Sequence, residues 1–390
     1  MDIFVQLALA VGVALLLGRL IRYIHMPNVT AYLVAGLVAG PCVLGLITSE
    51  GLDSLSFLTE LALGFIAYSI GGEFKISFLK QIGKAPYIVT LFEGLTATVL
   101  VDSVLIAIGT PVPEALMFGA IAAATAPAAT LMVVRQYKAK GPVTNILLPV
   151  VAMDDALGLM LFAVSTAIAK GMLGGTVTLY SMLLQPVLEI LESLLLGAAL
   201  GFALTFVTRF FHSRANMLTL SIAFVLLSVG LASMWGLSSL LVCMMLGAVM
   251  INCCNKADKL VEQCDRFTAP LFLMFFMLSG ANLDLAILPS VGVIGLLYLL
   301  VRAIGKWAGA SVGAAISKQS PTVKKYMGLT LIPQAGVAIG MAQMSKTMMP
   351  EYADVINTVI LSATLVYELT GPIITKLALQ KAGEIAIEKA

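Results

Sequence analysis

Two adjacent acidic residues, Asp154 and Asp155, interrupt a strongly apolar stretch. They come 12 and 13 residues after Pro142, which is about 18 Å along a helix and therefore near the middle of a membrane. Adjacent helical residues point about 100° apart, so at least one carboxylate faces a cavity or a break in a neighbouring helix. Carboxylates bind protons or alkali cations, and two so close titrate as a coupled unit. The pair predicts cation and proton exchange; the alternative is a structural pair held by hydroxyls or basic residues.

A proline interrupts the preceding apolar stretch. Pro127 lies inside AIAAATAPAATLMVV, where its ring removes a backbone hydrogen bond and clashes with the preceding turn. A helix interrupted there exposes carbonyl oxygens at membrane depth, which is tolerated only where they line a cavity or are buried. These carbonyls, with the hydroxyls of Thr125 and Thr130, are hard oxygen donors suited to Na+, Li+ or K+. Taken alone, a simple proline kink explains the motif equally well.

A second interruption occurs in LTLIPQAGVAIG, where Pro333, Gln334 and Gly336 break an apolar stretch near its middle. By the order of the apolar stretches, the two interrupted stretches cross the membrane in opposite directions. Paired interruptions in opposed halves are typical of inverted-repeat transporters with a site at the membrane midplane. The two breaks together therefore predict such a site.

Other ionisable residues also lie deep in apolar stretches. Each costs about 2.5 to 3.5 kcal/mol on insertion scales, so it needs a partner or a role. Arg302 is deep in LLYLLVRAIGKWAGA, Lys306 is one turn further on, and the deep acids include Glu93 and Glu368. We predict that Arg302 pairs with Glu93 as a charge-compensating pair, because their stretches occupy corresponding places in the two halves. A pair that only holds two helices together is an equal alternative, and Lys306 is long enough to reach the membrane surface.

The composition is that of a membrane protein. Of the 390 residues, 60% are hydrophobic and 11% are charged, whereas about 25% of a soluble domain is charged. The net charge of +2 gives no indication of nucleic-acid binding. The five cysteines lack the paired spacing of zinc or redox sites. We therefore predict no cofactor, no nucleic-acid partner and no enzymatic activity.

Apolar runs long enough to cross about 30 Å of hydrocarbon predict an all-α polytopic fold with about thirteen transmembrane helices. The connections between them are short, so we expect a single transmembrane domain over 1–390, without a soluble regulatory domain or a removable signal peptide. The predicted spans are 3–22, 28–47, 54–71, 84–108, 113–134, 142–168, 179–208, 216–234, 237–254, 267–283, 286–316, 325–346 and 353–377.

The basic residues are distributed asymmetrically between the two sides of these spans. Lys170 and Lys346 lie on one side and Arg302 and Lys306 lie within a span, which leaves 19 of the 23 Lys and Arg residues on the other side. Because cytoplasmic loops are enriched in Lys and Arg, we predict an outside N-terminus and a cytoplasmic C-terminus in a plasma (inner) membrane.

Together these features resemble the monovalent cation–proton antiporter superfamily, in particular the second cation–proton antiporter family with its NapA-like and Kef-like proteins. The resemblance extends over nearly the whole chain. It rests on Asp154-Asp155, on Thr125-Ala126-Pro127, on Arg302 followed by Gly305, and on Ser69-Ile70-Gly71-Gly72-Glu73, which is similar to a Gly-Leu-Glu helix ending of that family.

The resemblance implies an NhaA-like inverted repeat with two crossed discontinuous helices. Its core bundle would comprise approximately 84–168 and 286–377, and the other helices would form a dimer or scaffold part of a homodimer. The resemblance further implies that Asp155 is the principal cation and proton carboxylate, that Asp154 is its neighbour, and that Thr125 and Ala126 contribute from the unwound stretch.

Arg302 departs from the pattern of electrogenic relatives, which carry a Lys there that is able to release a proton. Arg does not deprotonate in proteins. Some relatives pair such an Arg with a Glu, matching Glu93, and tend towards electroneutral exchange, whereas the double Asp argues the other way. The stoichiometry stays open, with a lean towards one proton per cation.

We therefore predict a secondary active antiporter that exchanges Na+ or Li+, or K+, for protons by elevator-type alternating access. Its partners would be these ions, the lipid bilayer and a second copy of the chain. The alternative within transporters is a Na+-coupled symporter of an organic solute on a similar fold. A channel or a membrane subunit without transport would explain the spans but not the paired breaks.

Overall fold

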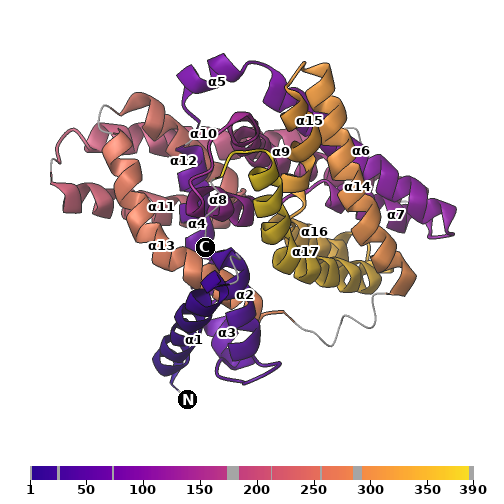
Figure 1. Ribbon diagram of the computed structural model, residues 1–390, viewed down its shortest axis with the longest axis horizontal. Coiled ribbons are helices and arrows are strands. Elements are labelled where there is room, and N and C mark those ends of the chain that lie inside the picture. The colour runs from indigo at the N-terminus through magenta and orange to yellow at the C-terminus, as the bar shows by residue number, and fades with distance from the viewer. Residues whose placement is uncertain are drawn as a thin grey trace. The chain divides into compact units, whose positions relative to one another are not determined.

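The computed structural model describes residues 2–23, 27–72, 74–173, 184–211, 213–254, 257–283 and 292–385, which form helices joined by turns and irregular segments, with no strand among them (Figure 1). Each of the predicted spans overlaps at least one of its helices. These are α1 (Ile3–Tyr23), α2 (Asn28–Ala39), α3 (Ser49–Ser54), α4 (Ser56–Gly71), α5 (Ile76–Ile82), α6 (Ala85–Ala107), α7 (Val112–Ala122), α8 (Pro127–Gln136), α9 (Pro142–Met172), α10 (Gln185–Val207), α11 (Arg214–Trp235), α12 (Ser239–Cys253), α13 (Ala257–Ala281), α14 (Gly292–Ile316), α15 (Pro321–Tyr326), η3 (Met327–Leu331), α16 (Gly336–Met348) and α17 (Ala353–Lys381).

The described helices fit a multi-pass membrane protein. Eight helical stretches are long and apolar enough to cross a membrane, and one of them, Val112–Gln136, joins α7 and α8. Four shorter apolar helices accompany them: Asn28–Ala39, Ser56–Gly71, Ser239–Cys253 and Phe267–Ala281. A helix pairs its own backbone N–H and C=O groups, which find no hydrogen-bond partners in hydrocarbon. The total of thirteen spans stays a prediction.

One compact unit comprises residues 1–24, 31–81 and 187–282. Its helices α4 and α12 pack through glycines, because a Cβ atom at Gly71 would collide with the carbonyl oxygen of Met244, and one at Gly247 with that of Tyr68. Small residues let membrane helices approach this closely. Gly71 is also the last residue of α4 in the Gly-Gly-Glu motif, whose Glu73 lies outside the described residues.

The second compact unit comprises residues 25–30, 82–186 and 283–390 and contains α6 to α9, α14 to α17 and η3. It includes the ranges 84–168 and 286–377, for which the resemblance implies a core bundle. The assignment of the two units to core and dimer roles stays a prediction.

Within this unit, α6 and α14 pack closely along their length (Figure 1). Gly305, Gly309 and Gly313 of α14 repeat every four residues and so share one face of the helix. A Cβ atom at Gly309 would lie 2.6 Å from the Cα atom of Glu93, and one at Gly305 would lie 2.7 Å from that of Ala97. The glycines therefore set the register in which α14 meets α6.

Candidate cation and proton site

The helix is interrupted at both predicted prolines. Residues 123–126 separate α7 from α8, and residues 332–335 separate η3 from α16. The two breaks touch, because the backbone N–H of Ala126 donates to the carbonyl oxygen of Pro333 at 2.8 Å. Backbone groups freed by one break are thus partly satisfied by the other, as the membrane interior requires.

Arg302 of α14 is fully buried between the two breaks. Its guanidinium donates to the carbonyl oxygens of Ala122 at 3.0 Å and Ala124 at 2.6 Å, and to that of Ile332 at 2.8 Å. Its Cζ atom also lies 4.6 Å from the centre of the Tyr367 ring. The carboxyl end of a helix carries a partial negative charge. Arg302 therefore balances the ends of α7 and η3 and holds both breaks together.

Lys306, one turn beyond Arg302, is also fully buried. Its ammonium lies 2.6 Å from Oε2 of Glu93 and 3.0 Å from Oδ2 of Asp154. It donates to the Thr125 hydroxyl at 2.9 Å and to the carbonyl oxygen of Ala123. One cation thus joins carboxylates from α6 and α9 to the first break.

The predicted contact between Arg302 and Glu93 is wrong, because Glu93 pairs with Lys306. The physical reason is the register of α14: Gly309, three residues after Lys306, lies against the backbone of Glu93 and brings the Glu93 carboxylate to the Lys306 ammonium. The burial of Lys306 also excludes the interpretation that this side chain reaches the membrane surface.

The aspartate pair lies in α9 with different surroundings for its two members. Asp154 is fully buried, and its Oδ2 accepts from the Thr125 hydroxyl and from Lys306. Asp155 is 1% exposed, and within the described residues neither of its carboxylate oxygens has a hydrogen-bond partner. Gly158, one turn further along, packs against Ala124 of the first break. Asp155 is therefore a buried carboxylate with its full binding capacity free.

The buried charges of this cluster do not balance when all are ionised. Three carboxylates, Glu93, Asp154 and Asp155, stand against two cations, Arg302 and Lys306, which leaves one negative charge. Ionised groups in a low-dielectric interior require compensation. One bound proton or one monovalent cation supplies it.

The remaining residues singled out from the sequence link the two breaks. Thr130 of α8 donates its hydroxyl to the carbonyl oxygen of Thr330 in η3 at 3.2 Å. The Gln334 side-chain amide donates to the carbonyl oxygen of Ile121 and to the hydroxyl of Tyr298, both at 2.9 Å. Both are buried, and their contacts support the breaks rather than Asp155.

Sequence reasoning missed two tyrosines of this cluster. Tyr298 lies four residues before Arg302 on the same face of α14, a spacing that could have indicated it. Tyr367, whose ring contacts Arg302, donates its hydroxyl to the carbonyl oxygen of Leu299 at 2.5 Å. Its neighbour Glu368 is buried and forms no hydrogen bond or ion pair with any described residue.

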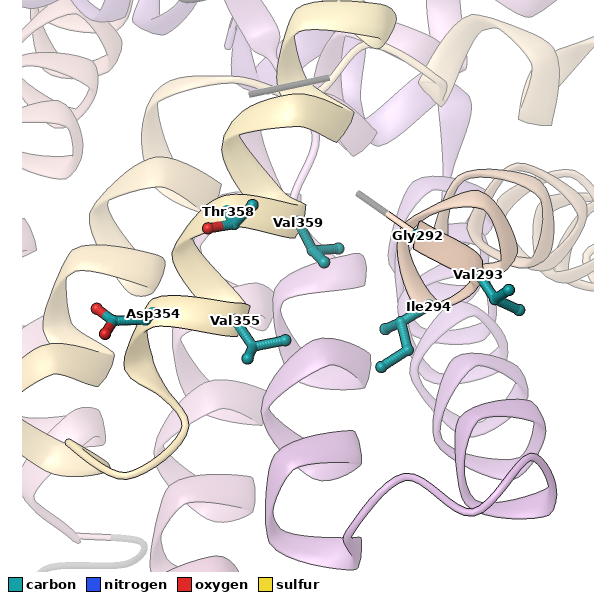
Figure 2. Close-up of a pocket in the computed structure, with 7 residues that line it drawn as sticks. All are labelled: Gly292, Val293, Ile294, Asp354, Val355, Thr358 and Val359. Carbon is teal, nitrogen blue, oxygen red and sulfur yellow. The ribbon is translucent and has the colours of Figure 1, made fainter. Parts of the chain in front are cut away.

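A pocket of about 410 Å³ lies between the first turns of α14 and α17 (Figure 2). Its mostly apolar lining contains none of the residues predicted for the cation site. It is lined by Gly292, Val293, Ile294, Asp354, Val355, Thr358 and Val359. This pocket is therefore separate from the Asp155 cluster.

Known proteins resemble most of the chain. The Na(+)/H(+) antiporter NhaS4 of Synechocystis sp. is 24% identical, with 95% of this chain and 98% of that protein covered. The Na(+)/H(+) antiporter 1 of Methanocaldococcus jannaschii is 26% identical, with 82% and 78% covered. The structure of the sodium proton antiporter MjNhaP1 from the same organism shares the fold, with a TM-score of 0.79, 21% identity and 98% of both chains covered.

The family described as sodium/hydrogen exchanger, transmembrane, matches residues 7–380. This match covers both interrupted helices, the aspartate pair and the two buried cations of α14. The chain thus belongs to the sodium/hydrogen exchangers, a family of monovalent cation–proton antiporters.

Proposed function

We propose that the protein exchanges a monovalent cation for protons, with cation and proton competing for Asp155. The observation that carries this proposal is the Asp155 carboxylate, which is buried in the helix that packs on the first break and is unpaired in the described structure. The names of its relatives, which are Na+/H+ antiporters, support the same reaction.

The charge of the cluster supports competition between the two ions. With Lys306 and Arg302 both charged, one Na+ or one proton at Asp155 brings the cluster to neutrality. Both ions together would give the cluster a net positive charge. An unoccupied site carries a net charge that is costly to move through hydrocarbon. The Asp155 site therefore crosses the membrane more readily loaded with one ion or the other than empty, which favours exchange over leak.

The nearby oxygens support an alkali cation as the ligand. Asp154 and the Thr125 hydroxyl are joined to each other and to Lys306, so binding to Asp155 takes place beside hard oxygen donors. We propose Na+ or Li+ as the transported cation, with K+ as a further candidate. Ala126 and Pro127 contribute by keeping the backbone unwound at this point.

We also propose elevator-type alternating access by a homodimer. All residues of the cluster belong to the same compact unit, which is therefore able to carry the site as one body. The asymmetry of basic residues supports an outside N-terminus and a cytoplasmic C-terminus in a plasma (inner) membrane. The symporter alternative is not favoured, because the named relatives are antiporters.

The test uses purified protein in liposomes with an acidic interior and a pH-sensitive dye. NaCl, LiCl, KCl or choline chloride is added in turn. We expect saturable dequenching with one or more alkali cations and none with choline. Asp155→Asn should abolish the response, because the amide neither ionises nor exchanges protons.

Asp354→Asn is the matched control, since it makes the same chemical change at an exposed aspartate in the same unit. Its exchange should equal that of the wild type. Full cation-dependent proton movement by the Asp155→Asn protein would overturn the proposal.

A further inference from the structure

One face of α17 is polar along most of its length. Asn357, Thr364, Glu368, Gly371 and Thr375 follow one another at spacings of seven, four, three and four residues, so they lie on one side of the helix. All of them are buried. Glu368 lies near the middle of the 29-residue helix, where an ionisable group in a membrane-spanning segment is a candidate for function.

Helix α17 packs against α16 and η3, which flank the second break (Figure 1). The amide of Asn357 donates to the carbonyl oxygen of Ala342 in α16 at 3.0 Å. A Cβ atom at Gly371 would lie 2.8 Å from Cγ of Pro333 in the break. Glu368 is one turn before Gly371, so its side chain projects beside the break rather than towards lipid.

The polar atoms of this face are largely unsatisfied by the protein. Glu368 is 4% exposed and has no hydrogen bond or ion pair within the described residues. The hydroxyls of Thr364 and Thr375 and the Oδ1 atom of Asn357 also have no partner there. Buried polar atoms normally bond to protein or to ordered water. The face therefore carries polar atoms without a protein partner on both sides of a buried carboxylate.

No neighbouring charge holds Glu368 in one ionisation state. Among the elements packed against α17, none of the described charged side chains pairs with Glu368. Helix η3 contains no charged residue, and the Lys346 side chain of α16 lies outside the described part. The described charges are Glu114 on α7, Arg135 on α8, Arg302 and Lys306 on α14, and Lys324 and Lys325 on α15.

We propose that Glu368 binds a second transported proton, so that two protons move for each cation. This proposal rests on the proposed exchange at Asp155. A proton and a monovalent cation that replace each other at Asp155 move no net charge. A proton carried on Glu368 in the opposite direction to the cation makes the exchange electrogenic.

The step involves proton transfer only. Water on one side of the membrane gives up a proton, which forms an O–H bond with a carboxylate oxygen of Glu368. After the unit has moved, the same bond breaks and water on the other side accepts the proton. Glu368 belongs to the same compact unit as Asp155, so both sites travel together.

The number of protons per cation is measured from the gradients that stop net flux. Proteoliposomes receive opposing Na+ and proton gradients, and equal thiocyanate on both sides keeps the membrane potential near zero. A tenfold proton gradient balances a roughly hundredfold Na+ gradient if two protons move, and a roughly tenfold one if one moves. We expect net flux to stop at a Na+ gradient of about hundredfold for the wild type and about tenfold for Glu368→Gln.

Asp354→Asn serves as the control on the same helix, and its net flux should stop at the same Na+ gradient as that of the wild type. Glu368→Met replaces Glu368→Gln if the latter does not elute as a folded protein. A wild-type balance at about tenfold overturns the proposal without any variant, as does an unchanged balance in the Glu368 variant. Absence of Na+-dependent flux in the wild type would instead refute the proposed exchange.

Discussion

Lys306 of α14 lies 2.6 Å from Glu93 of α6, and both side chains are fully buried within the membrane-spanning helices. The same ammonium is 3.0 Å from Asp154 of α9. One cation therefore neutralises carboxylates on two helices, next to the Asp155 carboxylate that stays unpaired. Removing the cation of such a cluster leaves buried negative charge without compensation.

Lys306→Met should destabilise the protein more than Glu93→Gln. The first variant leaves Glu93 and Asp154 without a cation, which costs about 3 to 5 kcal/mol for a buried pair. The second leaves Lys306 with Asp154 and the Thr125 hydroxyl and costs about 1 kcal/mol. Thermal unfolding in detergent measures the difference. Adding Glu93→Gln to Lys306→Met should recover part of the loss; equal effects of the two single variants would contradict this account.

Arg302→Lys should slow exchange although it keeps the charge. A guanidinium reaches the carbonyl oxygens of Ala122, Ala124 and Ile332 together, whereas an ammonium is a compact point charge and cannot span them. We expect a loss of roughly tenfold in the maximal rate, since each misplaced contact weakens the alignment of the two breaks. Initial rates of dye dequenching test it, and a wild-type rate would exclude a positioning role for Arg302.

Gly309→Ala should disturb the contact between α6 and α14. Its Cβ atom would lie 2.5 Å from the carbonyl oxygen of Phe92 and 2.6 Å from Cα of Glu93, so the helices must separate. Overpacking of this kind costs about 1 to 3 kcal/mol. Gly340→Ala is the control, because nothing lies within 4 Å of its added Cβ atom. A melting temperature equal in the two variants would argue against the proposed register.

Glu384→Ala should destabilise the first turn of α9, the helix that carries Asp154 and Asp155. The Glu384 carboxylate accepts from the backbone N–H groups of Val143 at 2.5 Å and Thr144 at 2.8 Å, and from the Thr144 hydroxyl at 2.6 Å. Loss of such an N-terminal cap costs about 1 kcal/mol. Glu384→Gln keeps an accepting oxygen and should lose less. Hydrogen exchange at residues 143–146 reports the change, and unaltered protection in Glu384→Ala would show that the cap is dispensable.

Competition at Asp155 predicts how cation affinity depends on pH. Where the site is mainly protonated, each unit of acidification should raise the apparent KM for the cation by about tenfold, because one proton must leave before one cation binds. In the alkaline range the KM should become constant, and the maximal rate should then fall as protons grow scarce. Initial rates over a matrix of pH and cation concentration measure both trends. A KM independent of pH across the whole active range would rule out a shared carboxylate.

Much of the architecture was already determined by the sequence. Helices have to satisfy their own backbone hydrogen bonds in hydrocarbon, so apolar runs of spanning length predict helices, and a proline inside such a run predicts a break. Asp154 and Asp155 could also be recognised from the sequence, because carboxylates at this depth are costly and need a role. These features also carried the resemblance to the antiporter superfamily.

The partners of the buried cations were decided only by the tertiary structure. Arg302 and Lys306 lie one turn apart on the same helix, so either could meet an acid on α6 as far as spacing is concerned. The close packing of Gly309 against α6 brings Glu93 to Lys306, and the contact between the two breaks gathers three carbonyl oxygens around Arg302. The cap on α9 joins Glu384 to Thr144, two residues that are 240 positions apart in the chain. Such contacts depend on helix register and crossing, which local patterns along the chain do not specify.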